Sequence, residues 1–439
     1  MRTYPVKLQD GAVWLDLTDP PLAARRERVL TSLRSAFDDE DYERLARDLA
    51  RLAVLGDPLD ALRAAVDWSW DHLEYGWTHA YAGMAGWLEL RQERADDTEA
   101  GLAALLEGLA PLAEDCLRQG RHAFAEGERA WSEADFLAAV EAEDEDTAVA
   151  YLRGAMGAGL HFAELERAFS TAALAHYADF GHSLIYTVKA GELIGQLGPS
   201  VEAPLLLSLL RSLIYATRED LIPEFRDYAA ALKGWGGDRA APAPADYRGL
   251  NERRALALTA AHGSAPAPAL YQALLGANAH NLLAFDIALQ TRIDQPVADN
   301  AGWLDVTHGI TFAEAVRRQC GKFPALWPQG LLQMACFAGR NSRFNDPAVR
   351  PEDWRVADEA RFLRHAANRL FDHGQSENIV AVHLLKTTLA VRRELASGAA
   401  GQTRAVLLAG LHRFLESPMP RRHVRRTVKQ AMALVALGE

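Results

Sequence analysis

The feature that most limits what this chain can fold into is a helical repeat of apolar residues, which begins after Pro20-Pro21 and continues almost to the C-terminus. Apolar residues recur three and four positions apart in segments rich in Ala, Leu and Arg, the pattern of helices that bury one face. Few stretches after residue 30 resemble strands. We therefore predict an all-α fold, a single large array of helices over residues 21–439.

The predicted helices follow one another with short connections. We place them at residues 22–36, 40–55, 58–92, 97–120, 121–140, 145–178, 180–196, 201–217, 219–233, 270–292, 310–321, 325–338, 355–371, 376–396, 402–415 and 420–437. Two stretches rich in Pro, Ala and Gly, at 236–249 and 262–269, are expected to be surface connections.

The first 20 residues follow a different pattern. TYPVKLQDGAVWLDL (3–17) alternates apolar and polar residues around Asp10-Gly11, a dipeptide that favours a two-residue hairpin turn. An isolated two-stranded hairpin is marginally stable in water. We therefore expect a short β-hairpin within residues 1–20 that packs on something else, either its own chain or a neighbour.

The charge and the cysteines exclude several classes of protein. With 59 acidic and 47 basic residues among 439, the formal net charge is -12, which argues against general affinity for nucleic acid or anionic membranes. No apolar run is long enough to cross a bilayer, and no signal peptide opens the chain. Cys116, Cys320 and Cys336 form no CxxC pair, so neither a disulfide framework nor a thiolate zinc site is expected. These features predict a cytoplasmic protein without nucleic-acid or membrane partners.

A histidine and a lysine lie in the apolar face of one predicted helix. In ENIVAVHLLKTTLAVRREL (377–395), a single face contains Ile379, Val382, His383, Lys386 and Ala390. A basic pair on a buried face costs free energy unless it has partners. His383 and Lys386 are therefore either satisfied by neighbouring groups or bind a ligand.

Other histidines lie in similar apolar settings. Of the 14 histidines, those in charged or connecting segments are expected to be structural or solvated: His122, His262, His365, His373, His412 and His423. A second set has small or apolar neighbours: His72, His79, His161, His182, His308 and His383. Each one alone is more simply a core histidine bonded to a carbonyl or carboxylate. Together they also suit a metal site, because imidazole is the commonest transition-metal ligand and bundles build such sites from facing helices. Their spacing matches neither HExxH nor a Glu-x-x-His pair.

Several of these segments resemble, in order along the chain, the histidine motifs of the questin oxidase-like proteins, helical enzymes linked to oxidative opening of polycyclic aromatic quinones. WTHAYAGMAGWLEL contains His79, and GAMGAGLHFAELERAF contains His161, followed by Phe162 where the family has Gly. GHSLIYTVKAGEL contains His182 and is similar to the same motif, so His161 and His182 are alternatives for one position.

The C-terminal half continues the resemblance. GWLDVTHGITFAEAVR, with His308, resembles the family's His-x-x-Thr segment. AVHLLKTTLAV, with His383 and Lys386, is similar to its His-x-x-Lys helix. The resemblance covers residues 55–400, roughly.

The resemblance implies a mononuclear non-haem Fe(II) site. The implied ligands are His79, His308, His383 and Lys386, completed by His161, His182 or both. A protonated ammonium has no lone pair, so Lys386 would be either a neutral amine, with a pKa lowered by burial, or a carbamate formed with carbon dioxide. We favour the carbamate, because an all-imidazole site leaves the charge of Fe(II) uncompensated. A buried salt bridge to an acid on a neighbouring helix is the alternative role for Lys386.

The hairpin resembles a second family. TYPVKLQDGAVWLDL is similar to the closing hairpin of a Rieske ferredoxin domain, which binds a [2Fe–2S] cluster through two Cys and two His. None of those ligands is present, since the first cysteine is Cys116. We therefore predict no cluster in this chain. Residues 1–20 are interpreted as a Rieske-like remnant, from a relict or truncated electron-transfer module, upstream of the helical domain at 21–439.

The resemblance to the questin oxidase-like proteins implies a metal-dependent (iron) oxygenase that oxidises or opens an aromatic or quinone-like ring with O2. Its partners would be a small aromatic molecule, O2, and a ferredoxin or another electron donor. An aromatic set could line the substrate pocket or simply pack the core: Trp68, Trp70, Tyr75, Trp77, Tyr81 and Trp87. Two alternatives stay open, a metal-dependent hydrolase with a carbamylated lysine and a non-catalytic helical scaffold or binding protein. In a scaffold the histidine helices would not converge.

Overall fold

The computed structural model describes residues 5–116, 120–175, 178–216, 225–292, 294, 300–399, 401–418 and 428–433. Within them the chain is all-α with one N-terminal hairpin of two strands, as the sequence predicts. The elements are β1 (Val6–Gln9), β2 (Ala12–Leu15), α1 (Leu22–Asp38), α2 (Tyr42–Leu55), α3 (Asp60–Ser69), α4 (His79–Glu93), α5 (Thr98–Cys116), α6 (Glu133–Glu141), α7 (Glu145–Gly157), α8 (Phe162–Ala175), α9 (Ala178–Leu197), α10 (Glu202–Ile214), α11 (Tyr228–Lys233), α12 (Glu252–Ala261), α13 (Ala267–Ala284), α14 (Trp303–Lys322), α15 (Trp327–Ser342), α16 (Glu359–Leu370), α17 (Asn378–Ala396) and α18 (Gly401–Glu416).

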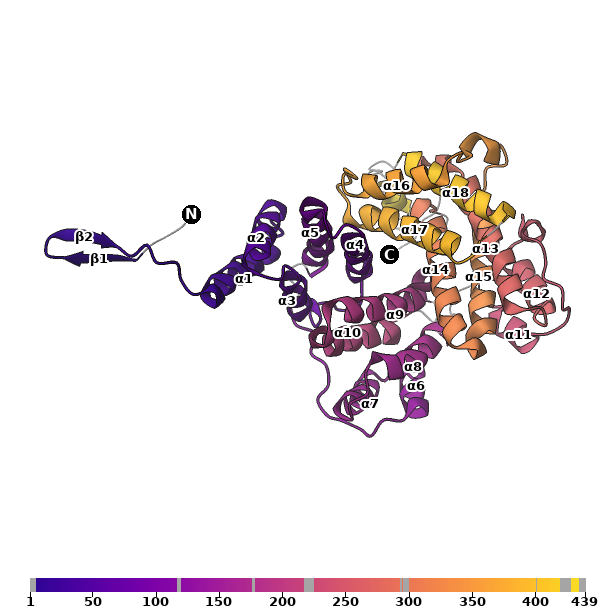
Figure 1. Cartoon of the computed structure of the whole chain (residues 1–439). Coiled ribbons are helices and arrows are strands. Elements are labelled where there is room, and N and C mark those ends of the chain that lie inside the picture. Colours follow the sequence, from indigo (N-terminus) through magenta and orange to yellow (C-terminus); the bar gives the residue numbers. More distant parts are fainter. Residues whose placement is uncertain are drawn as a thin grey trace.

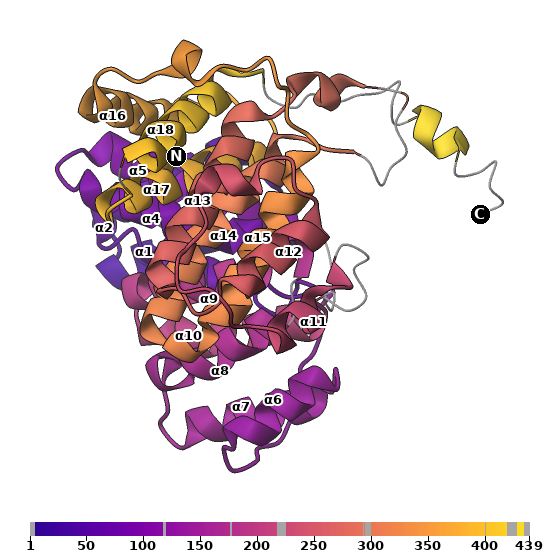
Figure 2. The same cartoon turned by 90° about the vertical axis from the view of Figure 1, so that its right-hand side faces the viewer.

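The helices share one connected apolar core, built from buried residues of α1 to α18. In Figure 1, α1–α5 lie on one side of this core, α11–α15 lie on the other, and α9 and α10 pass below and between them. Turned by 90°, α16 and α18 lie at one end of the molecule and α6 and α7 at the other (Figure 2). Among the described helices none has the length and hydropathy needed to span a membrane.

Four helices form a closed ring inside this array. α4 packs on α9 and α17, and α14 packs on the same two helices from the other side. Glycines on α4 allow the close approach of α17: a Cβ on Gly83 would lie 2.8 Å from Val382 Cγ2, and one on Gly86 would lie 3.0 Å from Leu385 Cδ2. The ring is therefore tight enough for side chains of all four helices to meet at its centre.

Three predicted helix boundaries are wrong, each for a local reason. The helix predicted over 58–92 is two helices, α3 and α4, because the chain turns at Gly76, where φ is +78°. His72 therefore lies in the connection between α3 and α4, whereas His79 is in α4. The helix predicted over 145–178 divides into α7 and α8 around Gly159, where φ is +82°. α14 begins at Trp303 and not at 310, because the Asp305 carboxylate accepts the Gly302 N–H at 2.8 Å and caps the earlier start.

Other predicted helices are shorter or lie outside the described residues. The one expected over 121–140 begins only at Glu133, after an irregular segment. Most of 420–437 falls in segments that the structure does not describe. The hairpin is confirmed, with Asp10 and Gly11 at φ values of +54° and +76° in its turn and Val6 paired with Leu15. In Figure 1 it projects away from the helices.

The turn at Gly76 generates a test of the fold. A Cβ at this position would overlap the backbone carbonyl oxygen of Ser208 in α10, and φ is already in the left-handed region. We expect Gly76→Ala to lower the free energy of unfolding by about 2–4 kcal/mol, through strain and overpacking together. Urea denaturation followed by circular dichroism measures it.

Gly198→Ala is the matched control. Its φ is +89°, but no atom lies within 4 Å of an added Cβ. Its ψ of −178° also belongs to a region that favours glycine, so this variant should lose only the conformational part, about 1–3 kcal/mol. Equal losses in the two variants would show that the contact with α10 does not hold this turn.

Candidate metal centre

Four histidines and one lysine from the ring of α4, α9, α14 and α17 meet at one point. They are His79 of α4, His182 of α9, His308 of α14, and His383 with Lys386 of α17. Their nitrogens form a continuous set of contacts: His383 Nε2 to His79 Nε2 at 3.3 Å, His79 Nε2 to His182 Nε2 at 3.1 Å, His182 Nε2 to His308 Nε2 at 2.8 Å, and His308 Nε2 to Lys386 Nζ at 2.9 Å. Five of the six residues singled out from the sequence therefore lie together.

His161 is the sixth, and the structure does not bring it to this cluster. It precedes α8 at the surface, with 68% of its side chain exposed, and its Nδ1 lies 2.9 Å from Glu202 Oε2. The hydrogen bond with Glu202 raises the pKa of His161. Of the two alternatives left open by the sequence, His182 is the one that joins the other histidines, and His161 is part of a surface ion pair.

Local sequence explains how the helices present their histidines. Thr78 caps α4, its hydroxyl accepting the Ala80 N–H at 3.2 Å, so that His79 is the first helical residue. Next to His182, Gly181 has a φ of +76°, and a Cβ there would overlap the Phe312 ring of α14. Glycine at this position therefore lets α9 approach α14 closely enough for His182 to reach His308.

The cluster is buried on one side and partly accessible on the other. His308, His383 and Lys386 are 4%, 1% and 6% exposed, whereas His79 and His182 are half-buried. Among the described side chains of the cluster, the two that keep some exposure are therefore those near the start of α4 and of α9.

Burial keeps these groups neutral. Desolvation is the main cause that lowers the pKa of each of the four histidines well below its usual range, and the nearby Lys386 adds to it. Burial likewise lowers the pKa of Lys386 well below its usual range, helped by the charge of Lys189. Among the described residues no carboxylate pairs with Lys386, so the buried salt bridge considered for it is not found there. Neutral imidazoles and a neutral amine have the lone pairs that a metal ligand needs.

Hydrogen bonds alone cannot satisfy the nitrogens of this cluster. The Nε2 of a neutral imidazole has either one N–H or one lone pair, directed along a single line in the ring plane. The Nε2 atoms of His79, His182 and His308 each contact two other nitrogens. A cation at the centre would remove this conflict, because each nitrogen would direct its lone pair at the same point.

The spacing of the nitrogens fits such a cation. Two nitrogens bound to one metal at about 2.1 Å lie about 3.0 Å apart if their bonds are at right angles and about 3.4 Å apart in a tetrahedron. Three of the four contacts, at 2.8–3.1 Å, fall nearer the first value, and the contact between His383 and His79, at 3.3 Å, falls nearer the second. His79, His308 and His383 also form the only group of three metal-binding side chains found among the described residues, with ligand atoms within 4.8 Å of one another.

The tautomer of His383 is fixed by Thr307. The Thr307 hydroxyl donates its one hydrogen to the Leu304 carbonyl at 2.9 Å and lies 2.9 Å from His383 Nδ1. With its hydrogen used, the hydroxyl can only accept, so Nδ1 carries the proton and Nε2 carries the lone pair. Such an outer hydrogen bond is typical of histidines that bind metals.

Aromatic rings adjoin the accessible side of the cluster. The Tyr186 ring stacks on His182 with ring centroids 5.3 Å apart, and its hydroxyl lies 3.5 Å from His79 Nδ1. Trp77 packs against Tyr186 and donates its Nε1–H to the Leu205 carbonyl at 2.9 Å. Of the aromatic set picked from the sequence, Trp77 is thus linked to the cluster through Tyr186, which the sequence did not single out.

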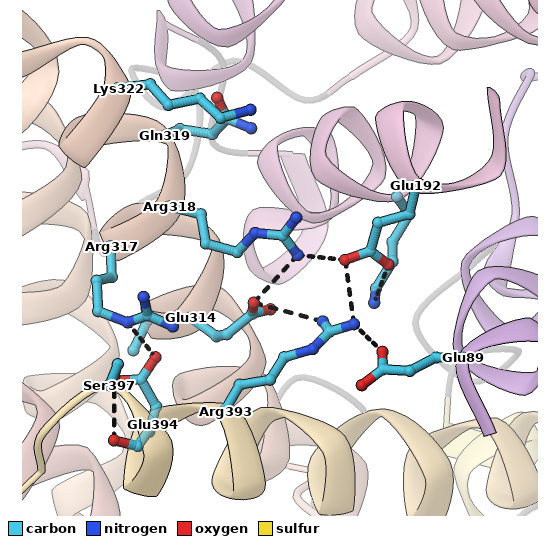
Figure 3. A network of polar contacts seen from close by, with 12 residues as sticks. Glu89, Glu192, Glu314, Arg317, Arg318, Gln319, Lys322, Arg393, Glu394 and Ser397 are labelled. Atoms are coloured by element: carbon cyan, nitrogen blue, oxygen red, sulfur yellow. Dashed lines mark hydrogen bonds and ion pairs between the residues drawn. The ribbon is translucent and has the colours of Figure 1, made fainter. Parts of the chain in front are cut away.

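An ionic network joins the same four helices further along (Figure 3). The Glu192 carboxylate of α9 forms ion pairs with the Lys189 ammonium at 2.8 Å and with the Arg393 guanidinium of α17 at 3.1 Å. It also pairs with Arg318 of α14. Arg393 in turn contacts Glu89 of α4. Each helix therefore contributes to both the histidine cluster and this network.

The histidine cluster and the ionic network are separated by the same number of residues in all four helices. Glu89, Glu192, Arg318 and Arg393 each follow the histidine of their own helix by ten residues, which is about 15 Å along a helix axis. All four helices therefore leave the cluster toward the same side. Sequence reasoning missed this network, because a charge ten positions after a histidine is common unless one knows which histidines meet.

The network generates a pH-dependent prediction. Burial alone would raise the pKa of Glu192, but Lys189, Arg393 and Arg318 hold it well below its usual range. The stability that Glu192 contributes is therefore present above its unfolded-state pKa of about 4.3 and is lost as the pH falls below that value. We expect Glu192→Gln to lower the free energy of unfolding by about 3–5 kcal/mol at pH 7, because it leaves three cations with one partner fewer.

Denaturation at pH 7 and at lower pH tests this. The difference between wild type and Glu192→Gln should shrink below about pH 4. As a control, Glu133→Gln removes the carboxylate of the surface pair with Arg167, and its effect should stay within about 1 kcal/mol. A difference for Glu192→Gln that is constant with pH would refute the assigned charge state.

Comparison of the chain with protein-family models, with curated proteins and with solved structures gives no match in any of the three. The likeness to the questin oxidase-like proteins therefore depends on the motifs alone and stays a prediction.

Proposed function

We propose that the cluster binds one Fe(II) ion and that the protein is an iron-dependent oxygenase acting on an aromatic or quinone-like ring. The observation that carries this proposal is the convergence of four imidazoles and one amine in a ring of four helices, where each is joined to the next by a nitrogen–nitrogen contact of 2.8–3.3 Å. The order of the histidine motifs along the chain adds support, since it resembles that of the questin oxidase-like proteins.

The residues present suit such an ion. His79, His182, His308 and His383 would hold it through Nε2, and Thr307 keeps His383 in the ligand tautomer. When bound, iron supplies the binding and activation of O2. The chain contributes the rest: it buries three of the groups completely enough to exclude water and leaves access beside His79 and His182.

Lys386 would act as a carbamate. Its neutral amine attacks carbon dioxide, a C–N bond forms, and one proton is released to solvent, which leaves an anionic carboxylate-like group on Nζ. The described residues offer no other negative charge at the cluster, because the acids and bases of the network pair with one another. A carbamate would therefore offset part of the charge of Fe(II), which neutral imidazoles cannot do.

The aromatic side chains around the cluster favour an aromatic substrate. An aromatic ring that approaches from the side of His79 and His182 would meet these two imidazoles, and the buried rings of Tyr186 and Trp77 pack behind them. We propose a ferredoxin or another electron donor as partner. A cytoplasmic location agrees with the three cysteines, which are all free and buried.

The two other functions have less support. A hydrolase with a carbamylated lysine commonly uses two metals, whereas the described residues contain one group of three metal-binding side chains. A scaffold or binding protein has no need for histidines that meet, and here four of them do.

Metal analysis of matched histidine variants tests the proposal. Protein purified without a polyhistidine tag should contain about one iron per chain, since the imidazole set fits one ion. His182→Ala should lose most of it. His161→Ala should keep it, because this side chain is exposed at a site apart from the cluster. The iron-loaded protein should consume O2 when given a polycyclic aromatic quinone, and His182→Ala should not.

Each alternative has its own outcome in the same experiment. Two zinc ions per chain would favour the hydrolase, and the absence of stoichiometric metal would favour the scaffold. Wild-type iron content in His182→Ala would contradict the ligand set.

The hydrogen bond of Thr307 gives a second test. Thr307→Val keeps the shape of the side chain but removes the acceptor of the His383 Nδ1–H. We expect affinity for Fe(II), measured by competition with a chelator, to fall about 10- to 100-fold. Thr387→Val is the control on the same helix as His383, because the Thr387 hydroxyl is buried and has no hydrogen-bond partner among the described residues. Equal affinities for the two variants would show that Thr307 does not orient His383.

A further inference from the structure

A basic pocket lies at the end of the molecule where α16 and α18 are found (Figure 2). It has a volume of about 540 Å³ and is formed by residues 355–358, by one face of α16 and by His412 of α18. Its lining contains the three arginines Arg355, Arg361 and Arg364. Small-molecule sites in proteins have volumes of roughly 300–1,000 Å³, so the pocket is large enough for an organic ligand.

The arginines of this pocket differ from the other arginines of the same region. Nine arginines lie between residues 350 and 413. Five pair with acids of the chain, namely Arg350, Arg369, Arg392, Arg393 and Arg404. A sixth, Arg413, is buried and donates to two backbone carbonyls. The other three are those that line the pocket, and none of their side chains has an ion pair or a hydrogen bond with a described residue.

The acids close to the pocket do not neutralise it. Asp358 is the one acid in the lining, and its carboxylate accepts the backbone N–H of Arg361 at 2.9 Å to cap α16. Glu359 pairs with Arg404, and Glu352 does not line the pocket. A cation in the first turn of a helix opposes the helix dipole, so Arg361 does not stabilise α16 from this position. Three guanidinium groups against one carboxylate leave an excess of positive charge.

Two aromatic rings belong to the same lining. Phe362 of α16 and His412 of α18 are half-buried, and their ring centroids lie 5.4 Å apart in an edge-to-face arrangement. The Nδ1 of His412 lies 3.1 Å from the Trp354 carbonyl oxygen, which can only accept, so Nδ1 carries the proton and the hydrogen bond fixes the ring. The pocket therefore combines guanidinium groups with an aromatic wall.

We propose that this pocket binds a nucleotide, with its phosphates on the three arginines and its base against Phe362 and His412. Guanidinium groups bind phosphate oxygens through paired N–H bonds, and aromatic rings attract a planar base. Inorganic phosphate would use only the arginines, and an uncharged aromatic molecule would use only the rings, whereas a nucleotide uses both. The pocket shares no residue with the histidine cluster, so this proposal does not depend on the metal centre.

Isothermal titration calorimetry with three probes tests the two halves of the pocket. ADP has both a base and phosphates, pyrophosphate has no base, and adenosine has no phosphate. We expect ADP to bind the full chain at one site, with a Kd on the order of 10–100 µM. Pyrophosphate should bind about 3- to 10-fold more weakly, because it lacks the contact with the rings. Adenosine should show no measurable binding at about 1 mM, because it leaves the guanidinium groups unpaired.

Three variants assign the contacts to residues. Arg361→Gln with Arg364→Gln should weaken ADP binding at least about 10-fold. Arg253→Gln with Arg254→Gln is the matched control, because these two exposed arginines at the start of α12 also have no ion pair with a described residue, and the change in net charge is the same. It should leave ADP affinity within about 2-fold of wild type. Phe362→Leu should weaken ADP about 3- to 10-fold and leave pyrophosphate unchanged, and that retained binding shows that the variant is folded.

Three results would overturn the proposal. Absence of saturable ADP binding to wild type at about 1 mM would mean that the pocket is not a nucleotide site. An equal loss of affinity in the two arginine double variants would mean that ADP responds to overall charge and not to the pocket. Pyrophosphate that binds as tightly as ADP, with Phe362→Leu without effect on either, would mean that the arginines bind anions and that no base is recognised.

Discussion

The rest of this structure depends on one constraint: four helices must keep a single register so that one side chain from each arrives at the same point. Apolar packing alone sets register weakly, because a helix can slide by a turn and still bury a similar face. The pairing of Glu192 with Lys189, Arg318 and Arg393 is more demanding, since a shift of one residue would leave buried charges unpaired. Buried ion pairs stabilise little compared with apolar packing, but losing one partner is costly. We therefore interpret the network as the feature that sets the register.

The side chains of the ionic network are charged and those of the histidine cluster are neutral, for a physical reason. At the network, acids and arginines are both charged, and their attraction outweighs the desolvation of Glu192. At the cluster there are only bases, so desolvation and mutual repulsion favour the neutral forms of the histidines and of Lys386. One helical ring thus holds a fully ionised layer and a neutral layer about 15 Å apart. The neutral layer is the one that can accept a cation.

Sequence pattern predicted the fold class, the hairpin turn at Asp10-Gly11 and most helix positions, because these depend on local periodicity and turn chemistry. It failed where a glycine or a helix cap sets the end of a helix. At Gly76 the nine-residue break between α3 and α4 does not disturb the apolar periodicity on either side. At Asp305 the hydrogen bond to the Gly302 N–H starts α14 earlier than the periodicity indicates. His182 and His161 could not be told apart from sequence, because both follow glycine-containing helical segments. Only the distortion of α9 at Gly181 brings one of them to α14. The roles of Thr307 and Tyr186 were also out of reach, since each depends on a contact between two helices far apart in sequence.

Because the ionic network is separate from the histidine cluster, the stability of the fold does not depend on the cluster. The network and the apolar core involve no side chain of the cluster, so the ring is held together whether or not a cation is bound. What a cation would change is local, namely the contacts among lone pairs that otherwise face one another across about 3 Å. The fold thus positions the centre, whereas a change of a side chain in the cluster need not disturb the fold.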